Sequence, residues 1–320
     1  MKSLSEALCR RIVPGLVSCE AKDRGVRDWL VSGTHGLMAG QASTEIVFDN
    51  ILLEEFVEYL LFDFQRFSLS SWESFSTKSA EVDVYGSVGW PFLKLYYSAF
   101  FACHAIMRSN GIGVVRIDDG NVLRDLNDLS SMFSVGYKFN SGNYVFRVFQ
   151  KEDYSWSVSL EYLPNKGGGA HDAFWKQFCF FLDKLAEDIS SKNEVDSLSS
   201  ISDIGIIKGI ITNNGRNDGG WLSVVRNKLN YSHEYGVWFP VVRRRDYIRM
   251  LRRVKKMPID GIRFDVDDGN KDLNSFLAAS HCLATLNFEV SEEMSSRPNN
   301  SRMFGAKWSR LRKDMRDGAQ

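Results

Sequence analysis

Residues 90–113 read WPFLKLYYSAFFACHAIMRSNGIG, and this stretch decides the class of fold. Pro91 suits the first turn of a helix, and Gly111 suits the position just after its last turn. The residues between them are apolar on nearly every face of the predicted helix. Such a helix is stable only when other elements surround it, so the sequence predicts a helical bundle with this segment near its centre.

Neighbouring segments supply the other helices of the predicted bundle. Apolar residues recur at three- and four-residue steps in ILLEEFVEYLLFDFQRF (51–67) and in HDAFWKQFCFFLDKLAEDI (171–189). A further apolar helix is predicted around SFLAASHCLATL (275–286). These segments indicate a protein that is mainly α.

Three of the histidines are given structural interpretations. His104 lies inside the central apolar helix, where a hydrogen-bonded core histidine is expected rather than a catalyst. His35 and His171 are assigned to loops, because each stands next to glycines and has no visible partner in the sequence.

A different periodicity appears after the central helix. From Tyr154 to Tyr162, large apolar residues alternate with serine and glutamate, which predicts a half-buried strand. NYVFRVF (143–149) is its predicted hairpin partner. This part of the chain is therefore expected to form a small antiparallel sheet inserted into the bundle, which makes the whole protein α+β.

The predicted organisation has four parts. The helical bundle is formed by residues 50–112 and 170–290, and the β insertion by residues 113–169. Residues 1–49, in which glycine interrupts short apolar stretches, are expected to form an irregular N-terminal cap. Residues 291–320 are expected to form a basic, loosely ordered tail.

Composition narrows the classes of function. Forty basic and forty acidic residues balance in a chain of 320, so attraction to nucleic acid or membrane must come from local clusters of charge. The five cysteines are scattered without a C-x-x-C pair, which is typical of reduced thiols in a cytoplasmic protein. No window is long and apolar enough for a membrane span, so a soluble protein is expected.

One predicted helix places polar side chains beside an apolar stripe. It follows a glycine turn and continues into VVRNKLNYSHEYGVWFP (224–240). At 100° per residue the apolar stripe consists of Trp221, Val225 and Leu229. The polar strip beside it consists of Arg226, Asn230 and His233. An arginine can bind a phosphate through two nitrogens and a histidine exchanges protons near neutral pH, so the strip could cleave a phosphodiester without a metal; alternatively, the asparagine and histidine only cap the helix.

Two stretches carry a resemblance to a known family. RNKLNYSH (226–233) resembles the Arg-polar-spacer-His signature of HEPN domains, with Arg226, Asn227 and His233 at the signature positions. PFLKLYYSAFFACHAIMRS (91–109) resembles the aromatic, alanine-rich helix of HEPN-like bundles. The resemblance covers residues 50–110 and 170–290. It implies an all-α bundle, usually a homodimer, in which two motif helices form one composite site that cleaves RNA.

The resemblance also implies a mechanism and a setting. In active members, the ribose 2′-OH attacks the adjacent phosphate without a metal or other cofactor. Arg226 would then orient the phosphate, and His233 would transfer the proton. The third catalytic residue, Asn227, and the substrate-positioning Asn230 would position the ribose or the histidine, and Tyr231 would also position the substrate. Bacterial members often act as toxins or in antiphage defence, so the expected partners are RNA, including tRNA, and an antitoxin or another subunit of a defence complex.

A basic segment follows the motif. RRRDYIRMLRRVKK (243–256) predicts a helix with an apolar stripe, and its clustered charges suit binding to a phosphate backbone, although a solvated helix face would look similar. The basic residues are Arg243, Arg244, Arg245, Arg249, Arg252, Arg253, Lys255 and Lys256.

Two alternatives to a nuclease remain open on sequence alone. The chain could be a non-catalytic subunit that binds nucleic acid or protein, with Arg226 and His233 only securing the bundle. It could also bind a small molecule through the sheet, although no polar residue there names a ligand. Metal-binding clusters, phosphate-binding loops and nucleophile motifs are not apparent.

Overall fold

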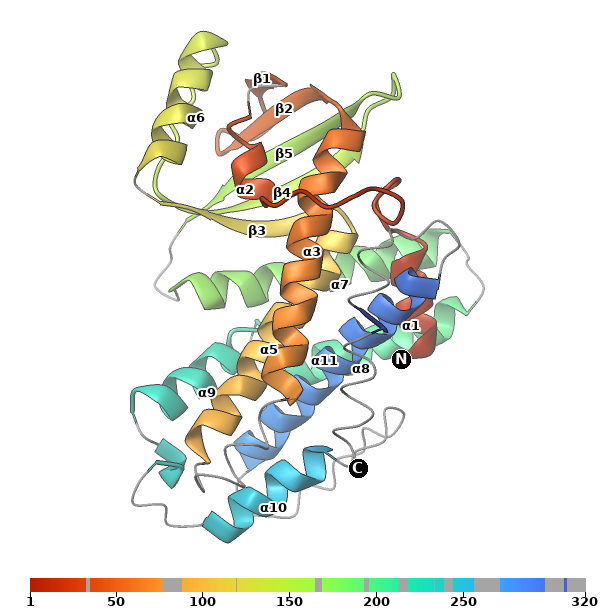
Figure 1. The fold of residues 1–320 in the computed structure, drawn as a ribbon, viewed down its shortest axis with the longest axis vertical. Helices are drawn as coiled ribbons and strands as arrows, with labels where there is room; N and C mark the ends of the chain where they lie inside the picture. Colours follow the sequence, from red (N-terminus) through yellow and green to blue (C-terminus); the bar gives the residue numbers. More distant parts are fainter. Residues whose placement is uncertain are drawn as a thin grey trace.

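The computed structural model describes residues 1–32, 35–76, 88–118, 120–164, 169–192, 196–212, 218–232, 234–238, 244–255, 271–296 and 308–309. Within these ranges the chain forms a long helical body with a five-stranded antiparallel sheet at one end (Figure 1). The expected combination of a mainly helical protein and a small antiparallel sheet is confirmed.

Helix α5 (Gly89–Ser109) is the centre of the helical body. It packs against α3 (Leu53–Ser76), α11 (Lys271–Ser296) and α9 (Trp221–Asn230), which lie beside it in Figure 1. Its side chains are buried on nearly every face, because helices surround it as its apolar sequence predicts. Gly111 follows the helix with φ +72°, a left-handed conformation that suits glycine.

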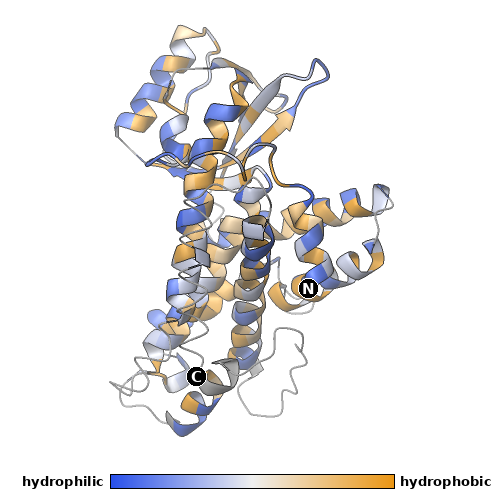
Figure 2. Cartoon of the chain, turned by 45° about the vertical axis from the view of Figure 1, so that its right-hand side comes forward, coloured by the Kyte–Doolittle hydropathy of each residue, from blue (hydrophilic) through white to orange (hydrophobic). Residues whose placement is uncertain are grey.

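The other helices complete the body and cover the sheet. Helix α1 packs on α8 and α11, so helices from opposite ends of the chain meet. Figure 2 shows hydrophobic and hydrophilic stretches on the helices of the body. In the described part of the chain, no helix is both long and hydrophobic enough to span a bilayer. The remaining helical elements are α1 (Lys2–Cys9), α2 (Val26–Trp29), α6 (Asn121–Met132), α7 (Gly169–Ser191), α8 (Ser197–Ile211), α10 (Arg244–Lys255) and the short 3-10 helix η1 (Glu234–Gly236).

The sheet recruits strands from the N-terminal segment. Its order is β1–β2–β5–β4–β3, and all neighbours are antiparallel. The strands are β1 (Gly36–Ala39), β2 (Glu45–Ile51), β3 (Ile112–Ile117), β4 (Gly142–Gln150) and β5 (Trp156–Leu163). The expectation of an irregular cap over residues 1–49 was therefore wrong for the strands β1 and β2 and for the helices α1 and α2. The signal was missed because β2 pairs with β5, more than a hundred residues away in the chain.

The predicted hairpin is confirmed. β4 pairs with β5, with Phe146 opposite Leu160. Tyr154 is not in the strand: it lies in the connecting turn with φ +67° and is 80% exposed. Ser157 is also buried, because β5 is an inner strand of the sheet and the Ser157 hydroxyl donates to Asp49 at 2.8 Å. The strand is therefore buried on both sides rather than on one.

The segment that was expected to form a C-terminal tail begins inside a helix. Helix α11 continues to Ser296, beyond the expected start of the tail at residue 291. Trp308 is 3% exposed and its ring lies 5.0 Å from that of Phe288, centroid to centroid. Residues 297–307 and 310–320 lie outside the described ranges.

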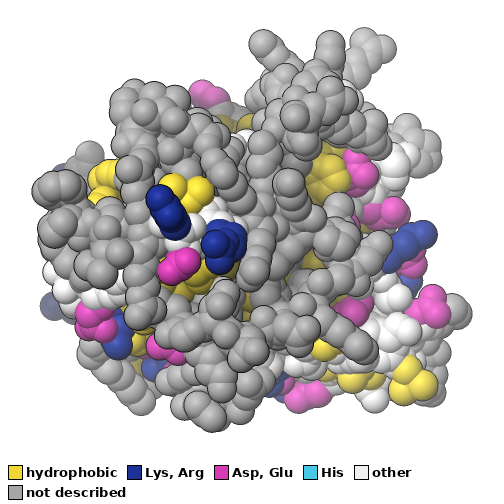
Figure 3. Space-filling model, turned by 90° about the horizontal axis from the view of Figure 1, so that it is seen from below, with side chains coloured by type: hydrophobic (Ala, Val, Ile, Leu, Met, Phe, Trp, Pro, Cys, Tyr) yellow, Lys and Arg dark blue, Asp and Glu magenta, His cyan; other side chains and the backbone are white. Residues whose placement is uncertain are grey.

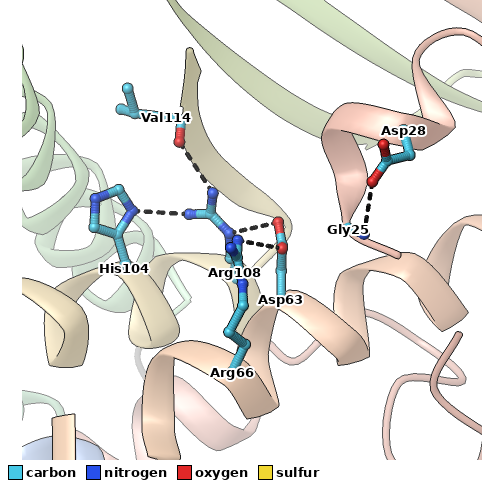
Figure 4. A network of polar contacts seen from close by, with 7 residues as sticks. All are labelled: Gly25, Asp28, Asp63, Arg66, His104, Arg108 and Val114. Carbon is cyan, nitrogen blue, oxygen red and sulfur yellow. Dashed lines mark hydrogen bonds and ion pairs between the residues drawn. The ribbon is translucent and has the colours of Figure 1, made fainter. Parts of the chain in front are cut away.

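A buried ionic network ties the sheet to the helical body (Figure 4). Arg108 donates from Nε to Asp63 at 3.0 Å, and from its two terminal nitrogens to His104 Nδ1 and to the backbone oxygen of Val114, each at 3.0 Å. Arg66 donates to the other oxygen of Asp63 at 2.9 Å. The network joins α3, α5 and β3. His104 is thus a hydrogen-bonded core histidine, as expected from the sequence.

Candidate functional site

The motif helix α9 begins after two glycines and buries the predicted stripe. Trp221, Val225 and Leu229 are each at most 5% exposed, which confirms the stripe. The indole nitrogen of Trp221 donates to the backbone oxygen of Ile210 at 3.1 Å, fixing the start of α9 against the end of α8. Gly219 has φ +94°, and an added Cβ there would approach the backbone oxygen of Trp175 to 3.0 Å. These contacts fix the start of α9 against α8 and α7, and so they fix which of its side chains face α5 and α7.

Arg226 reaches from α9 to the paired tyrosines of α5. One terminal nitrogen donates to the Tyr97 hydroxyl at 2.6 Å. The other donates to Asn227 Oδ1 at 2.9 Å and, more weakly, to the Tyr231 hydroxyl at 3.4 Å. The guanidinium carbon lies 5.7 Å from the ring centroid of Tyr97 and 5.3 Å from that of Tyr231. Two aromatic rings and three oxygens thus hold this side chain in place.

Within the described ranges, no acidic side chain pairs with Arg226. Of the described residues, none places a carboxylate oxygen within 4.0 Å of its guanidinium. Burial alone would lower the pKa of Arg226, but hydrogen bonds to Tyr97 and Tyr231 outweigh it and raise the pKa, so the side chain stays charged. A half-buried, immobilised cation whose described neighbours include no counter-ion is suited to binding an anion.

Of the residues that the sequence assigned to the site, three lie together and two do not join them in the described part of the chain. Arg226, Asn227 and Tyr231 are in direct contact, with Tyr231 69% exposed. Asn230 is the last residue of α9 and is half-buried. His233, the expected proton-transfer residue, lies outside the described residues.

His171 belongs to this cluster, and sequence reasoning missed it. It is on the first turn of α7, not in a loop, and its Nδ1 lies 2.9 Å from the Tyr96 hydroxyl. Its ring lies 6.1 Å from that of Tyr97 and 4.5 Å from that of Phe100, centroid to centroid. Burial and then the charge of Arg226 lower the pKa of His171 to about 4, so it is neutral at pH 7.

A sequence signal for His171 was present. His171 stands three and four residues before Phe174 and Trp175, both buried, so it shares their face of the helix. The preceding glycines made a loop the favoured interpretation, but the helix already begins at Gly169.

The basic segment forms the predicted helix α10. Arg245 and Arg249 are exposed and lie one turn apart, while Tyr247 and Leu251 of the predicted apolar stripe are buried. The Tyr247 hydroxyl donates to the backbone oxygen of Tyr235, which links α10 to the segment after α9. Seen from below, Figure 3 shows basic side chains next to an acidic one on this end of the molecule, with hydrophobic ones around them. Outside the described side chains lie those of Arg243, Arg244, Arg252, Arg253, Lys255 and Lys256.

The described part of the chain contains no candidate metal-binding site. Within those ranges, no group of three or more His, Cys, Asp or Glu side chains could hold a metal ion. The buried thiol of Cys103 has its pKa raised, mainly by desolvation, so it is not a reactive nucleophile.

Comparisons with known proteins give no relative. No protein-family model matches the chain, and neither a curated protein nor a solved structure is significantly similar to it.

Proposed function

We propose that this chain is a metal-independent endoribonuclease and that Arg226 binds the phosphate at which RNA is cleaved. One observation carries the proposal: an immobilised guanidinium, held by Tyr97, Tyr231 and Asn227, that has no carboxylate partner among the described residues. Arginine binds phosphate oxygens in this way because its nitrogens form a planar, permanently charged fork.

The proposed reaction uses the ribose as the nucleophile. The 2′-oxygen attacks phosphorus and gives up its proton, the bond from phosphorus to the 5′-oxygen breaks, and that oxygen takes a proton. The products are a 2′,3′-cyclic phosphate and a 5′-hydroxyl. Arg226 stabilises the negative charge that grows on the phosphate oxygens, and His233 transfers the protons.

Features outside the cluster support the same proposal. The motif RNKLNYSH and the tyrosine-bearing helix resemble those of HEPN domains, and α9 and α5 bring the two motifs into contact through Arg226 and Tyr97. Val224 of α9 and Tyr231, the residue that follows this helix, are 51% and 69% exposed, which leaves apolar surface for a second copy of the chain. We therefore propose a homodimer with two α9 helices at one composite site, acting in the cytoplasm in antiphage defence or as a toxin.

Arg226 and His233 are each expected to be required for rapid cleavage. Purified wild type, Arg226→Ala and His233→Ala are incubated with total RNA and with tRNA in EDTA. Wild type should leave 2′,3′-cyclic phosphate ends, and each variant should be slower by about 10²-fold or more, because each removes a group acting on the transition state. Product ends are identified by whether they resist ligation until the cyclic phosphate is removed.

A matched control separates the site from general loss of charge. Arg124 on α6 is 68% exposed and far from α9 in the fold, so Arg124→Ala should cleave like wild type. Equal cleavage by wild type, Arg226→Ala and His233→Ala would exclude this site. RNA binding that survives His233→Ala, with intact RNA in every lane, would favour a non-catalytic binding subunit instead.

A further inference from the structure

His171 and Arg226 are joined through the paired tyrosines of α5. The Tyr97 hydroxyl accepts from Arg226, and the Tyr97 ring lies edge-on to the imidazole of His171. Tyr96, the next residue, hydrogen-bonds His171 directly. Three helices, α5, α7 and α9, thus contribute to one polar cluster inside an otherwise aromatic environment.

The hydrogen bonds fix the state of the imidazole. The indole nitrogen of Trp175 donates to the Tyr96 hydroxyl at 3.1 Å, so the hydroxyl hydrogen itself is available for His171 Nδ1. Nδ1 then accepts, and the proton of neutral His171 is on Nε2. Nε2 has no hydrogen-bond partner among the described residues, and His171 is partly exposed.

A second acceptor for the Tyr96 hydroxyl is already in place. Ser223 is on α9, one turn before Arg226, and its buried hydroxyl oxygen has no hydrogen-bond partner in the part of the chain that the structure describes. Burial raises the pKa of Tyr96, and Ser223, which lies near it where α9 packs against α5, partly offsets that rise. If His171 gained a proton on Nδ1, the Tyr96 hydroxyl could turn towards Ser223 and accept from Nδ1 instead.

The charges around His171 oppose that proton. Arg226 is the cation that acts on it, whereas Asp172 on its own helix is paired with Lys176 at 2.9 Å. Counting described residues only, the titratable and charged groups around the imidazole are Tyr96, Tyr97 and His104 from α5, Arg226 from α9, and Asp172 and Lys176 from α7. An anion bound to Arg226 would cancel the repulsion and offer Nε2 an acceptor.

We propose that His171 is a second anion-binding residue of the Arg226 site, and that it takes up a proton when a phosphate group binds. This rests on the proposed function for its substrate, the phosphodiester of RNA, but the binding step requires no cleavage. The bound phosphate would be held by Arg226 on one side and by the His171 imidazolium on the other, with the Tyr96 hydroxyl turned to Ser223.

The test follows protonation directly. Imidazole signals of the protein are recorded by NMR between pH 3.5 and 7.5, with and without sulfate, an anion that does not itself titrate in this range. His171→Gln identifies the His171 signal by its loss, and the buried His104 serves as internal reference. Sulfate should move the midpoint of His171 protonation up by at least one pH unit. The affinity for sulfate should rise up to tenfold per unit as the pH falls from this raised midpoint towards the midpoint measured without sulfate.

Two variants test the route of the coupling. In Arg226→Gln, His171 should take up its proton at higher pH without any anion, and sulfate should no longer move the midpoint. In Ser223→Ala, which removes the alternative acceptor, the effect of sulfate should shrink while His104 is unchanged.

The results separate this inference from the nuclease. If RNA is cleaved but sulfate at saturating concentration leaves His171 unmoved, the inference is wrong and the nuclease stands. A sulfate-dependent His171 in a protein that never cleaves RNA would keep the anion site and remove the nuclease. Failure of both measurements removes both proposals.

Discussion

Arg108 and Arg226 differ in whether a carboxylate partners the guanidinium in the described part of the chain. Arg108 is 2% exposed and forms an ion pair with Asp63, which neutralises its charge inside the fold. Arg226 is half-buried and is held by hydroxyl and amide oxygens instead. Neutral acceptors orient a guanidinium without cancelling its charge, and this leaves Arg226 able to attract an anion.

At the same scale, Asp63 is predicted to be essential for stability. Replacing Asp63 by Ala leaves Arg108 buried without a counter-ion, which should lower the free energy of unfolding by about 3–5 kcal/mol. Urea denaturation of wild type and variant measures the loss. A loss below about 1 kcal/mol would contradict this account of the network.

The double variant Asp63→Leu with Arg108→Met is the control for that prediction. It removes both charges together, so it should be less destabilised than Asp63→Ala alone, by about 1 kcal/mol or more. If the double variant lost as much unfolding free energy as Asp63→Leu and Arg108→Met lose together as single variants, the two side chains would act independently.

Among the elements, sequence periodicity predicted what local residues determine. α5 and the β4–β5 hairpin were anticipated because their apolar spacing and their partners lie within one stretch of chain. β2 also alternates, with Ile46 and Phe48 buried, but its partner β5 is distant and nothing nearby marks the pairing. The same limit applies to the site: the spacing on α9 selected Arg226, whereas only the packing of α7 against α5 brings His171 to it.

Helix α10 carries its own prediction. If its exposed Arg245 and Arg249 contact the RNA backbone, each Ala substitution should weaken binding without changing which RNA is preferred. Each should also reduce the slope of log K against log salt by about 1, because one fewer counter-ion is released. Filter binding at several salt concentrations measures the slope, with Arg124→Ala as the control; an unchanged slope would place the RNA elsewhere.

For the molecule as a whole, three histidines make stability sensitive to acid. Burial lowers the pKa of His35 and His171 to about 4, and burial followed by the charge of Arg108 places that of His104 well below its usual value. The folded protein therefore keeps them neutral where the unfolded chain, with a histidine pKa near ~6.5, binds protons. Stability should be complete above that pH and fall as the pH drops towards 4.

The expected loss is up to about 1.4 kcal/mol per pH unit for each of the three histidines. Thermal or urea unfolding at pH 7, 6 and 5 measures it. Carboxylates with lowered pKa values, such as Asp49 and Asp188, contribute only nearer pH 4, so the interval from pH 7 to 5 isolates the histidines. Equal stability at pH 7 and pH 5 would show that the unfolded chain gains no protons that the fold excludes.

The pairing of β2 with β5 has a consequence for how the chain is made. On the ribosome, β2 is finished while about a hundred residues that lead to the end of β5 are still to be added, an interval on the order of ten seconds. Throughout it, Ile46 and Phe48 belong to a strand whose inner neighbour does not yet exist. An unpaired apolar strand is a template for wrong association, so we expect nascent chains to depend on a chaperone until Leu163 has emerged.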